Sequence, residues 1–192
     1  VDEIREIDIE DLLGRDIVPP NPELLGACIT AQSVMVTGAG GSIGSELCRQ
    51  IIEINPSKLV LLDSFEFGLY KLEAELVKKL QSIEGGDSIE IIALLGSIGN
   101  KLQMENAIKT FEVDTIYHAA AYKQVPMVEK NVVEGVQNNI FGTLVSAQAA
   151  EKFKVKNFVL ISTDKAVRPT NVMGATKRFA EQVLQALAAR KS

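Results

Sequence analysis

The sequence has few of the residues that metal sites and disulfide frameworks require. Its 192 residues include one histidine, His118, and two cysteines, Cys28 and Cys48. Structural zinc sites use sets of Cys and His ligands at short spacing, and disulfide-stapled domains need several cysteine pairs. These counts exclude both kinds of site, so we expect no bound metal ion and a reducing compartment.

Long apolar runs and clustered basic residues are also lacking. No apolar stretch is long enough to cross a bilayer, and no secretory leader precedes the acidic first residues. The chain has 20 basic and 25 acidic residues, which gives a formal net charge of −5. Nucleic-acid grooves need a clustered basic face. We therefore expect a soluble, cytoplasmic chain that does not bind nucleic acid.

The apolar content is sufficient for one packed domain with an N-terminal extension, because 46% of the residues are hydrophobic. Residues 1–30 are acidic with interspersed aliphatic residues, and their prolines Pro19, Pro20 and Pro22 forbid a continuous helix. We interpret 1–30 as an arm over the domain, with a short helix near Pro22–Leu25, or equally as a linker from an upstream segment. Residues 31–192 form the domain.

Within that domain, short β-rich runs alternate with longer amphipathic segments, a pattern typical of a parallel α/β sheet. In the second helical segment, leucines three or four residues apart share one face, and the segment stops before Gly85. Right-handed crossovers then predict a Rossmann-like, doubly wound sheet of strand order 3-2-1-4-5. The strands are expected over 33–37, 58–62, 89–94, 115–118 and 157–161, and the other helices over 42–54, 102–111, 132–153 and from 174 to the end. The chain ends near that last helix, so we expect the fold to be truncated before a further lobe.

A glycine-rich turn follows the first predicted strand and opens the first predicted helix. Its G-x-x-G-x-x-G spacing gives each glycine a role in dinucleotide binding: a tight turn, a close approach to the pyrophosphate, and close packing of the helix. The partial positive charge and free N–H groups of the helix N-terminus would hold the phosphates. The residues expected at the cofactor are Gly38, Gly41, Ser42, Ile43 and Gly44.

Asp63 ends the second predicted strand, nineteen residues beyond Gly44. A dinucleotide fold places at this point the carboxylate that accepts hydrogen bonds from the adenosine ribose, and the carboxylate repels a 2′-phosphate. The sequence therefore predicts NAD rather than NADP. The alternative for Asp63 alone is a structural aspartate in a strand-end turn.

The ends of the fourth and fifth strands should flank the nicotinamide, because ligands bind outside the carboxyl ends of such strands. His118 is expected to be a packed or hydrogen-bonded residue rather than a catalyst. The small residues Ala119 and Ala120 leave room for the cofactor. The polar run Ser162–Lys165 suits a turn or cap, but its adjacent Asp and Lys also suggest an acid and a base.

Several of these stretches resemble the extended short-chain dehydrogenase/reductases, and within them the bacterial nucleotide-sugar 4,6-dehydratases of the CapD and WbpM type. The resemblance covers about residues 12–192. It rests on Thr37–Gly44, on His118–Pro126 (HAAAYKQVP), on Asn139–Thr143 (NIFGT) and above all on Ser162–Lys177 (STDKAVRPTNVMGATK).

The resemblance implies a UDP-N-acetylglucosamine 4,6-dehydratase that oxidises the sugar at C4 with NAD, eliminates water across C5 and C6, and returns the hydride to C6. It implies that Lys165 removes the C5 proton, that Asp164 protonates the leaving hydroxyl and that Thr163 bonds near the C4 oxygen. Because the pair is so close, this microscopic assignment stays open. The resemblance also implies that Lys177 holds the nicotinamide ribose and that Ser97 and Ile98 lie at the adenine. Lys123 and Met173 are expected to contact the substrate.

Three positions depart from the wider superfamily. Met173 stands where most members have the tyrosine of Tyr-x-x-x-Lys. Members of the WbpM-like group also have this methionine. Because methionine cannot accept a proton, Asp164 or a water molecule is left to take the C4 hydroxyl proton. Ser97 replaces the usual aspartate that bonds the adenine amino group, so adenine recognition is expected to be weaker or rearranged. Gln124 stands in place of a usual histidine and has no interpretation from the sequence.

Two alternative functions remain. One is a nucleotide-sugar 4-epimerase or simple dehydrogenase on the same fold, and the Asp164–Lys165 pair argues against it because an epimerase needs no C5 base. The other is an NAD-binding module without activity of its own, because family members continue into a sugar-nucleotide lobe. We also expect a homo-oligomer packed through 132–153, and a full-length protein tethered to the inner membrane with this domain facing the cytoplasm.

Overall fold

The computed structural model describes residues 26–83 and 85–190. The short helix expected near Pro22–Leu25, and most of the predicted arm 1–30, lie outside these residues. Residues 26–30 form a turn in which the N–H groups of Ile29 and Thr30 donate to the Gly26 carbonyl. The Ile29 side chain is buried in the domain core, so the described end of the predicted arm packs with the domain.

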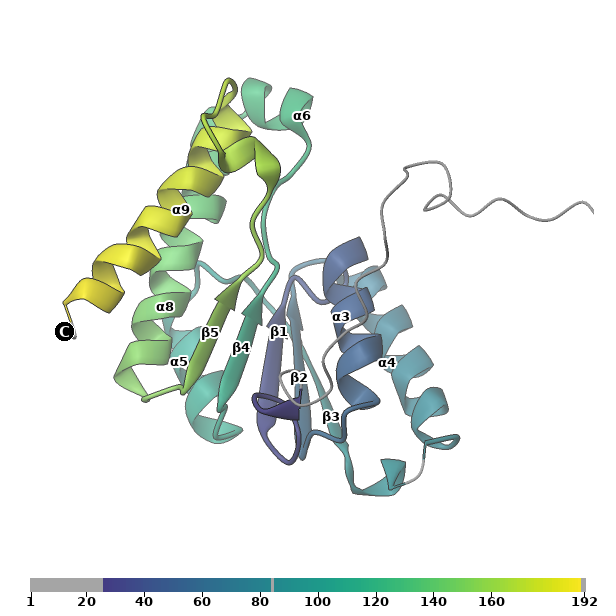
Figure 1. Cartoon of the computed structure of the whole chain (residues 1–192). Coiled ribbons are helices and arrows are strands. Elements are labelled where there is room, and N and C mark those ends of the chain that lie inside the picture. The colour runs from purple at the N-terminus through teal and green to yellow at the C-terminus, as the bar shows by residue number, and fades with distance from the viewer. Residues whose placement is uncertain (1–25, 84, 191–192) are drawn as a thin grey trace, which may run out of the picture.

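Five parallel strands form one sheet in the order β3-β2-β1-β4-β5, as the sequence predicted. The central strand β1 pairs with β2 on one side and β4 on the other, so that Met35 lies opposite Val60 and Ile116. The strands are β1 (Ser33–Thr37), β2 (Lys58–Asp63), β3 (Glu90–Leu95), β4 (Thr115–His118) and β5 (Asn157–Leu160). All five carboxyl ends lie at one edge of the sheet, which is the upper edge in Figure 1.

Helices cover both faces of the sheet (Figure 1). One face carries α3 (Ser42–Ile52) and α4 (Glu66–Leu80), and the other carries α5 (Lys101–Thr110), α8 (Thr143–Lys152) and α9 (Val172–Ala189). Successive strand residues point to opposite faces. Val34 and Val36 therefore belong to one core cluster and Met35 to the other. This burial on both faces explains why the strands read as continuous apolar runs.

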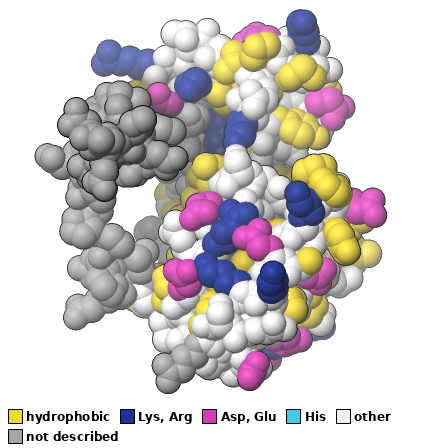
Figure 2. Space-filling view, turned by 90° about the vertical axis from the view of Figure 1, so that its right-hand side faces the viewer, with side chains coloured by type: hydrophobic (Ala, Val, Ile, Leu, Met, Phe, Trp, Pro, Cys, Tyr) yellow, Lys and Arg dark blue, Asp and Glu magenta, His cyan; other side chains and the backbone are white. Residues whose placement is uncertain are grey.

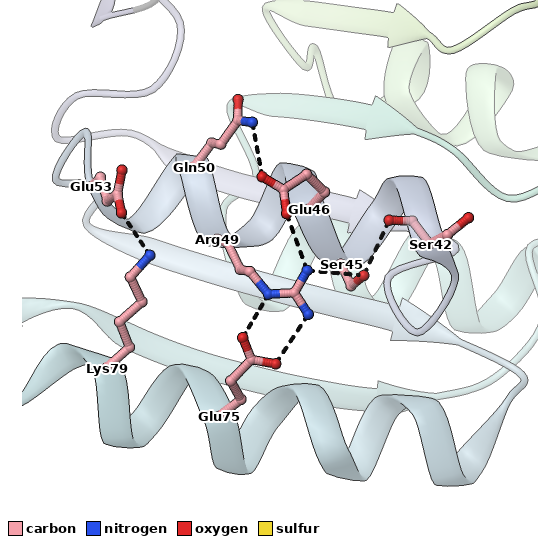
Figure 3. Close-up of polar contacts among 8 residues, drawn as sticks. All are labelled: Ser42, Ser45, Glu46, Arg49, Gln50, Glu53, Glu75 and Lys79. Carbon is pink, nitrogen blue, oxygen red and sulfur yellow. Dashed lines mark hydrogen bonds and ion pairs between the residues drawn. The ribbon is translucent and has the colours of Figure 1, made fainter. Parts of the chain in front are cut away.

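The two helices on the α3 side are joined by ion pairs (Figure 3). The guanidinium of Arg49 on α3 donates to both carboxylate oxygens of Glu75 on α4, at 2.6 and 3.0 Å. Lys79 on α4 bonds Glu53 at the end of α3 at 2.6 Å. Figure 2 shows basic and acidic side chains interleaved over this face. Exposed pairs stabilise little individually, but the two-pronged Arg49 contact fixes how α3 lies along α4.

The predicted single helix over 132–153 is wrong in detail. The segment consists of α7 (Val132–Val136), a π-helical stretch over Gln137–Gly142 and then α8, and it is preceded by α6 (Val125–Lys130), which was not predicted. The hydroxyl of Thr143, the first residue of α8, donates to the carbonyl of Asn139 in the π-helical stretch at 2.7 Å. The Gly142 position lies so close to Ile98 that an added Cβ would be 2.6 Å from its Cδ1. Tertiary packing therefore sets this irregular backbone.

Among residues 26–83 and 85–190, no helix is both long enough and apolar enough to span a bilayer.

His118 ends β4 and is fully buried, as a packed strand-end residue should be. Its Nε2 lies 3.0 Å from the Thr143 hydroxyl, and its Nδ1 lies 2.8 Å from the Thr37 hydroxyl. Thr143 gives its own proton to a carbonyl, so Nε2 carries the ring proton and Nδ1 accepts from Thr37. Burial, together with the charge of Lys177, lowers the pKa of His118 to about 3. The neutral ring therefore links β1, β4 and α8.

We expect the free energy of unfolding to fall as the pH drops from about 7 to about 5.5, by about 1 kcal/mol from His118 alone. The folded-state pKa lies below the unfolded value, so the unfolded chain gains the proton first and stability is lost toward the folded pKa of about 3. Urea titrations at both pH values measure this loss. His118→Gln, although less stable, should lose most of that pH dependence. An equal dependence in both proteins would contradict the role of His118.

Candidate functional site

The glycine turn between β1 and α3 is built by contacts too close for side chains. Gly38 has a left-handed φ of +71°, and a Cβ at this position would lie 2.6 Å from the Ala120 backbone nitrogen. A Cβ at Gly44 would collide with the Gly38 carbonyl oxygen. Glycine therefore lets α3 begin directly against the end of β1 and lets the residues after β4 lie on the turn.

A cavity of about 240 Å³ opens at this edge of the sheet. It brings together eight residues predicted to bind the cofactor, namely Gly38, Gly41, Ser42, Ile43, Gly44, Asp63, Ala119 and Ala120. A smaller recess of about 30 Å³ shares Gly38, Asp63 and Ala120 with it and adds two further predicted residues, Ser97 and Ile98. Lys177, also predicted to bind the cofactor, lines neither space. Sequence reasoning missed Ser64 and Asn138, which line both spaces.

Asp63 holds the turns on either side of it. Its Oδ2 accepts the Gly40 N–H at 2.8 Å, and its Oδ1 accepts the Phe65 N–H at 2.8 Å. Each carboxylate oxygen can accept a second hydrogen bond. The structural alternative and the ligand-binding prediction for Asp63 are therefore compatible, because the backbone contacts orient the carboxylate at the cavity wall.

Lys123, predicted to contact the substrate, lies at the predicted cofactor site. Its ammonium group donates to the Ser42 hydroxyl at 2.6 Å, at the first residue of α3. It also lines an adjoining, mostly apolar cavity of about 490 Å³ on the side of α6 and α7. A positive charge thus lies beside the N-terminus of α3, and a phosphate bound there would interact favourably with both.

Asn139 is a buried polar residue for which no role was predicted. Its Nδ2 donates to the Tyr122 carbonyl and to the Thr176 hydroxyl, both at 3.0 Å, and its Oδ1 accepts the Tyr122 N–H at 2.8 Å. The side chain therefore fixes the backbone next to Lys123 and ties it to α9. A polar residue inside an otherwise helical, partly apolar segment was the only sequence signal for this contact.

The predicted catalytic turn follows β5. The Thr163 hydroxyl donates to Asp164 Oδ1 at 2.9 Å, and the Lys165 ammonium lies 3.6 Å from the same oxygen. The side chains of Asp164 and Lys165 are 88% and 51% exposed. The hydrogen bond from Thr163 and the charge of Lys165 lower the pKa of Asp164. The pair is therefore open to solvent, with its carboxyl group ionised at neutral pH.

Helix α9 packs behind this turn and carries Met173 and Lys177. The Asn171 side chain caps α9 by accepting the Gly174 N–H at 2.7 Å. Lys177 is buried, and its ammonium donates to the Ile161 carbonyl at 2.6 Å. Burial lowers the pKa of Lys177. Met173 is also buried, so a substrate could touch it only after local rearrangement.

Glu181 is a further residue that the sequence did not single out. It accepts a hydrogen bond from the Ser162 hydroxyl at 2.5 Å and pairs with Arg178 at 2.8 Å. Both interactions lower the pKa of Glu181.

The predicted catalytic residues lie apart from the cavity. The structure places 163–165, Met173 and Lys177 around the end of β5, on the other side of β4 from the glycine turn. None of them is among the residues that line the 240 Å³ cavity.

Two known proteins with similar sequences are named for polysaccharide biosynthesis, and a third is named as a dehydratase. The capsular polysaccharide biosynthesis protein CapD of Staphylococcus aureus is 44% identical over 97% of this chain and 30% of its own length. The probable polysaccharide biosynthesis protein EpsC of Bacillus subtilis is 43% identical over 96% of this chain and 30% of its own. A UDP-N-acetylglucosamine 4,6-dehydratase (inverting) of Campylobacter jejuni is 28% identical over 81% of this chain and 43% of its own length.

Solved structures show the same fold. Pen from Bacillus thuringiensis superposes with a TM-score of 0.74 at 30% identity, over 83% of this chain and 47% of that one. UDP-glucose 4-epimerase from Bifidobacterium longum, in complex with NAD+ and UDP, has a TM-score of 0.69 at 21% identity. The match covers 82% of this chain and 49% of the epimerase chain. At this identity, the likeness to the epimerase concerns the fold alone.

The chain spans 30% of the length of CapD and of EpsC, so the comparison concerns one part of those proteins. The matching family model, described as polysaccharide biosynthesis protein, covers residues 34–192, which is more than half of the chain. Its range begins within β1 and includes both the glycine turn and the turn after β5. The chain therefore belongs to the family of polysaccharide biosynthesis proteins, with the fold of the nucleotide-sugar short-chain dehydrogenase/reductases.

Proposed function

We propose that this chain is the NAD-binding part of a UDP-N-acetylglucosamine 4,6-dehydratase that serves bacterial surface polysaccharide biosynthesis. The observation that carries the proposal is the shared edge of the sheet, where the glycine turn and Asp63 line one cavity and an Asp–Lys pair follows β5. The similarity to a dehydratase of that name supports the reaction class. The activity belongs to the whole protein of which such a chain is part.

The cavity residues suit NAD chemically. The first N–H groups of α3, at Ser42 and Ile43, would bind the pyrophosphate, with Lys123 as an added positive charge, while the Gly41 N–H donates to the Gly38 carbonyl. Asp63 would accept from the adenosine ribose hydroxyls, and Ala119 and Ala120 would leave room toward the nicotinamide. Lys177 would hold the nicotinamide ribose. When bound, NAD supplies a reversible hydride acceptor.

The turn after β5 would carry the proton transfers. Once the sugar is a ketone at C4, its C5 proton is acidic enough for Lys165 to remove, while Asp164 donates a proton to the departing C6 hydroxyl and Thr163 bonds near the C4 oxygen. In the structure, Asp164 is exposed and its pKa is lowered. The acid role therefore requires that bound substrate covers the pair, because loss of water raises a carboxyl pKa.

The other predicted contacts follow the same arrangement. After a local rearrangement that exposes its side chain, Met173 would form part of the substrate wall beside Lys177. Asp164 or a water molecule would take the C4 hydroxyl proton. An oligomer packed through 132–153 and a membrane tether on the full-length protein remain predictions. The competing functions are that of a 4-epimerase or simple dehydrogenase and that of a module that binds NAD without activity. Turnover experiments distinguish them.

Asp63→Asn should weaken NAD binding about tenfold and shift the NADP-to-NAD preference toward NADP, since it removes charged acceptors from the ribose and relieves repulsion of a 2′-phosphate. Calorimetric titration with both dinucleotides measures this. Asp87→Asn removes an equal charge at an exposed position on a 3-10 turn before β3 and should change neither affinity. An unaltered preference in Asp63→Asn would contradict the ribose contact.

Lys123→Gln should reduce NAD affinity about fivefold, because one charge-assisted contact to the pyrophosphate is lost. The affinity of the variant should also depend less on salt concentration than that of the parent. Lys130→Gln removes an exposed charge at the end of α6 and serves as the matched control. If both lysine variants bind NAD like the parent, Lys123 does not contact the cofactor.

Lys165→Ala, made in the full-length protein, should lower turnover of UDP-N-acetylglucosamine at least about a hundredfold, because general-base catalysis contributes about that much. In deuterated water the parent should yield a 4-keto-6-deoxy sugar labelled at C5, followed by NMR. Lys109→Ala, at an exposed position on α5, should retain turnover. Formation of UDP-N-acetylgalactosamine without a 6-deoxy product would identify an epimerase instead.

A further inference from the structure

The recess beside β3 is the part of the site whose ligand preference the proposed function does not specify. It measures about 30 Å³ and lies where Gly96, Ser97 and Ile98 follow the end of β3. Asp63 marks the adenosine ribose, and β3 lies beyond β2 at the outer side of the sheet. The base of a bound dinucleotide would therefore place its edge at this recess, while the pyrophosphate lies at the glycine turn.

The recess has few charged groups that could recognise the amino group of adenine. Asp63 is the only charged residue among those that line it, and its carboxylate already accepts the Gly40 and Phe65 N–H groups. The remaining side chains with polar atoms are Ser64, Ser97 and Asn138. Hydroxyl and carboxamide groups can each donate and accept hydrogen bonds.

The hydrogen bonds inside the chain leave Ser97 and Asn138 able to do both. The Ser97 oxygen accepts the Gly99 N–H at 3.2 Å, which leaves its own proton to donate and a lone pair to accept. One Asn138 N–H is used by Asn139 Oδ1 at 3.1 Å, and across residues 26–83 and 85–190 this is the hydrogen bond found for that side chain. Its second N–H and its carbonyl oxygen are available.

We infer that the base end of this cofactor site, through Ser97 and Asn138, accepts 6-oxopurine dinucleotides about as well as NAD. The inference rests on the proposed NAD function and concerns its specificity. Adenine presents a donor at its 6-position and an acceptor at N1, whereas hypoxanthine presents an acceptor and a donor. A carboxylate could only accept and would repel the 6-oxo group, but Ser97 and Asn138 can satisfy either edge by rotation. Ile98, which is buried, gives the recess an apolar wall that does not distinguish the purines.

The test is calorimetric titration of the chain with NAD and with nicotinamide hypoxanthine dinucleotide. The two dissociation constants should agree within about threefold, because neither base leaves a buried polar group unpaired. Ser97→Asp should create a preference for NAD of about tenfold or more, since hydrogen bonds to a charged acceptor are the stronger ones and the 6-oxo group would be repelled. Ser97→Ala should weaken both ligands to a similar extent.

Gln81→Glu adds the same charge at the exposed end of α4 and should leave the ratio of the two constants unchanged. A parent chain that binds NAD at least about tenfold more tightly than the hypoxanthine analogue would overturn the inference while leaving the NAD proposal intact. A Ser97→Asp variant with no preference would also overturn it, because Ser97 would then not face the base. Failure to bind either dinucleotide would contradict the NAD proposal, and with it this inference.

Discussion

The arrangement of the whole site depends on one steric constraint, the contact of backbone with backbone where β1 ends. Gly38 lies against the backbone of Ala119 and Ala120, and Gly44 lies against the Gly38 carbonyl. Because no side chain separates these segments, helix α3 starts at the strand end and its first N–H groups face the space above the sheet. Six of the fourteen residues that line the cavity are glycine or alanine, so recognition there depends on polar side chains such as Asp63 and Lys123.

Three lysines at this edge of the sheet have different surroundings, and the differences match the separate tasks proposed for them. Lys123 is exposed and hydrogen-bonds a serine, so it keeps the strongly hydrated charge that suits a phosphate. Lys177 is buried against a carbonyl, and burial lowers its pKa. Lys165 is half exposed beside a carboxylate. One residue type thus supplies different chemistry according to how much water surrounds it.

The sequence predicted the strands and their order because each apolar run is long enough for a buried strand and is followed by a turn residue, as at Gly38, Asp63 and Gly96. It also predicted eight of the residues that line the cavity, since the carboxyl ends of parallel strands meet at one edge, but it did not predict Ser64 or Asn138. It did not predict α6. It also did not predict the π-helical stretch over Gln137–Gly142, because that stretch depends on tertiary contacts of Asn139 with Thr176 and of Gly142 with Ile98. The Lys123–Ser42 contact joins residues 81 positions apart, and no local pattern encodes it.

The buried hydrogen bonds that link the side chains of Thr37, His118 and Thr143 join distant parts of the sequence and therefore affect how the molecule folds. Thr37 and His118 are 81 residues apart, so β1 can complete its pairing only after the chain has been synthesised through β4. Parallel sheets with such distant partners fold slowly, because chain entropy is lost before the contacts form. The turn after β1 and the segment after β4, which this contact brings together, both line the cofactor cavity. A ligand that binds it would therefore stabilise the assembled sheet as a whole rather than either half of the chain.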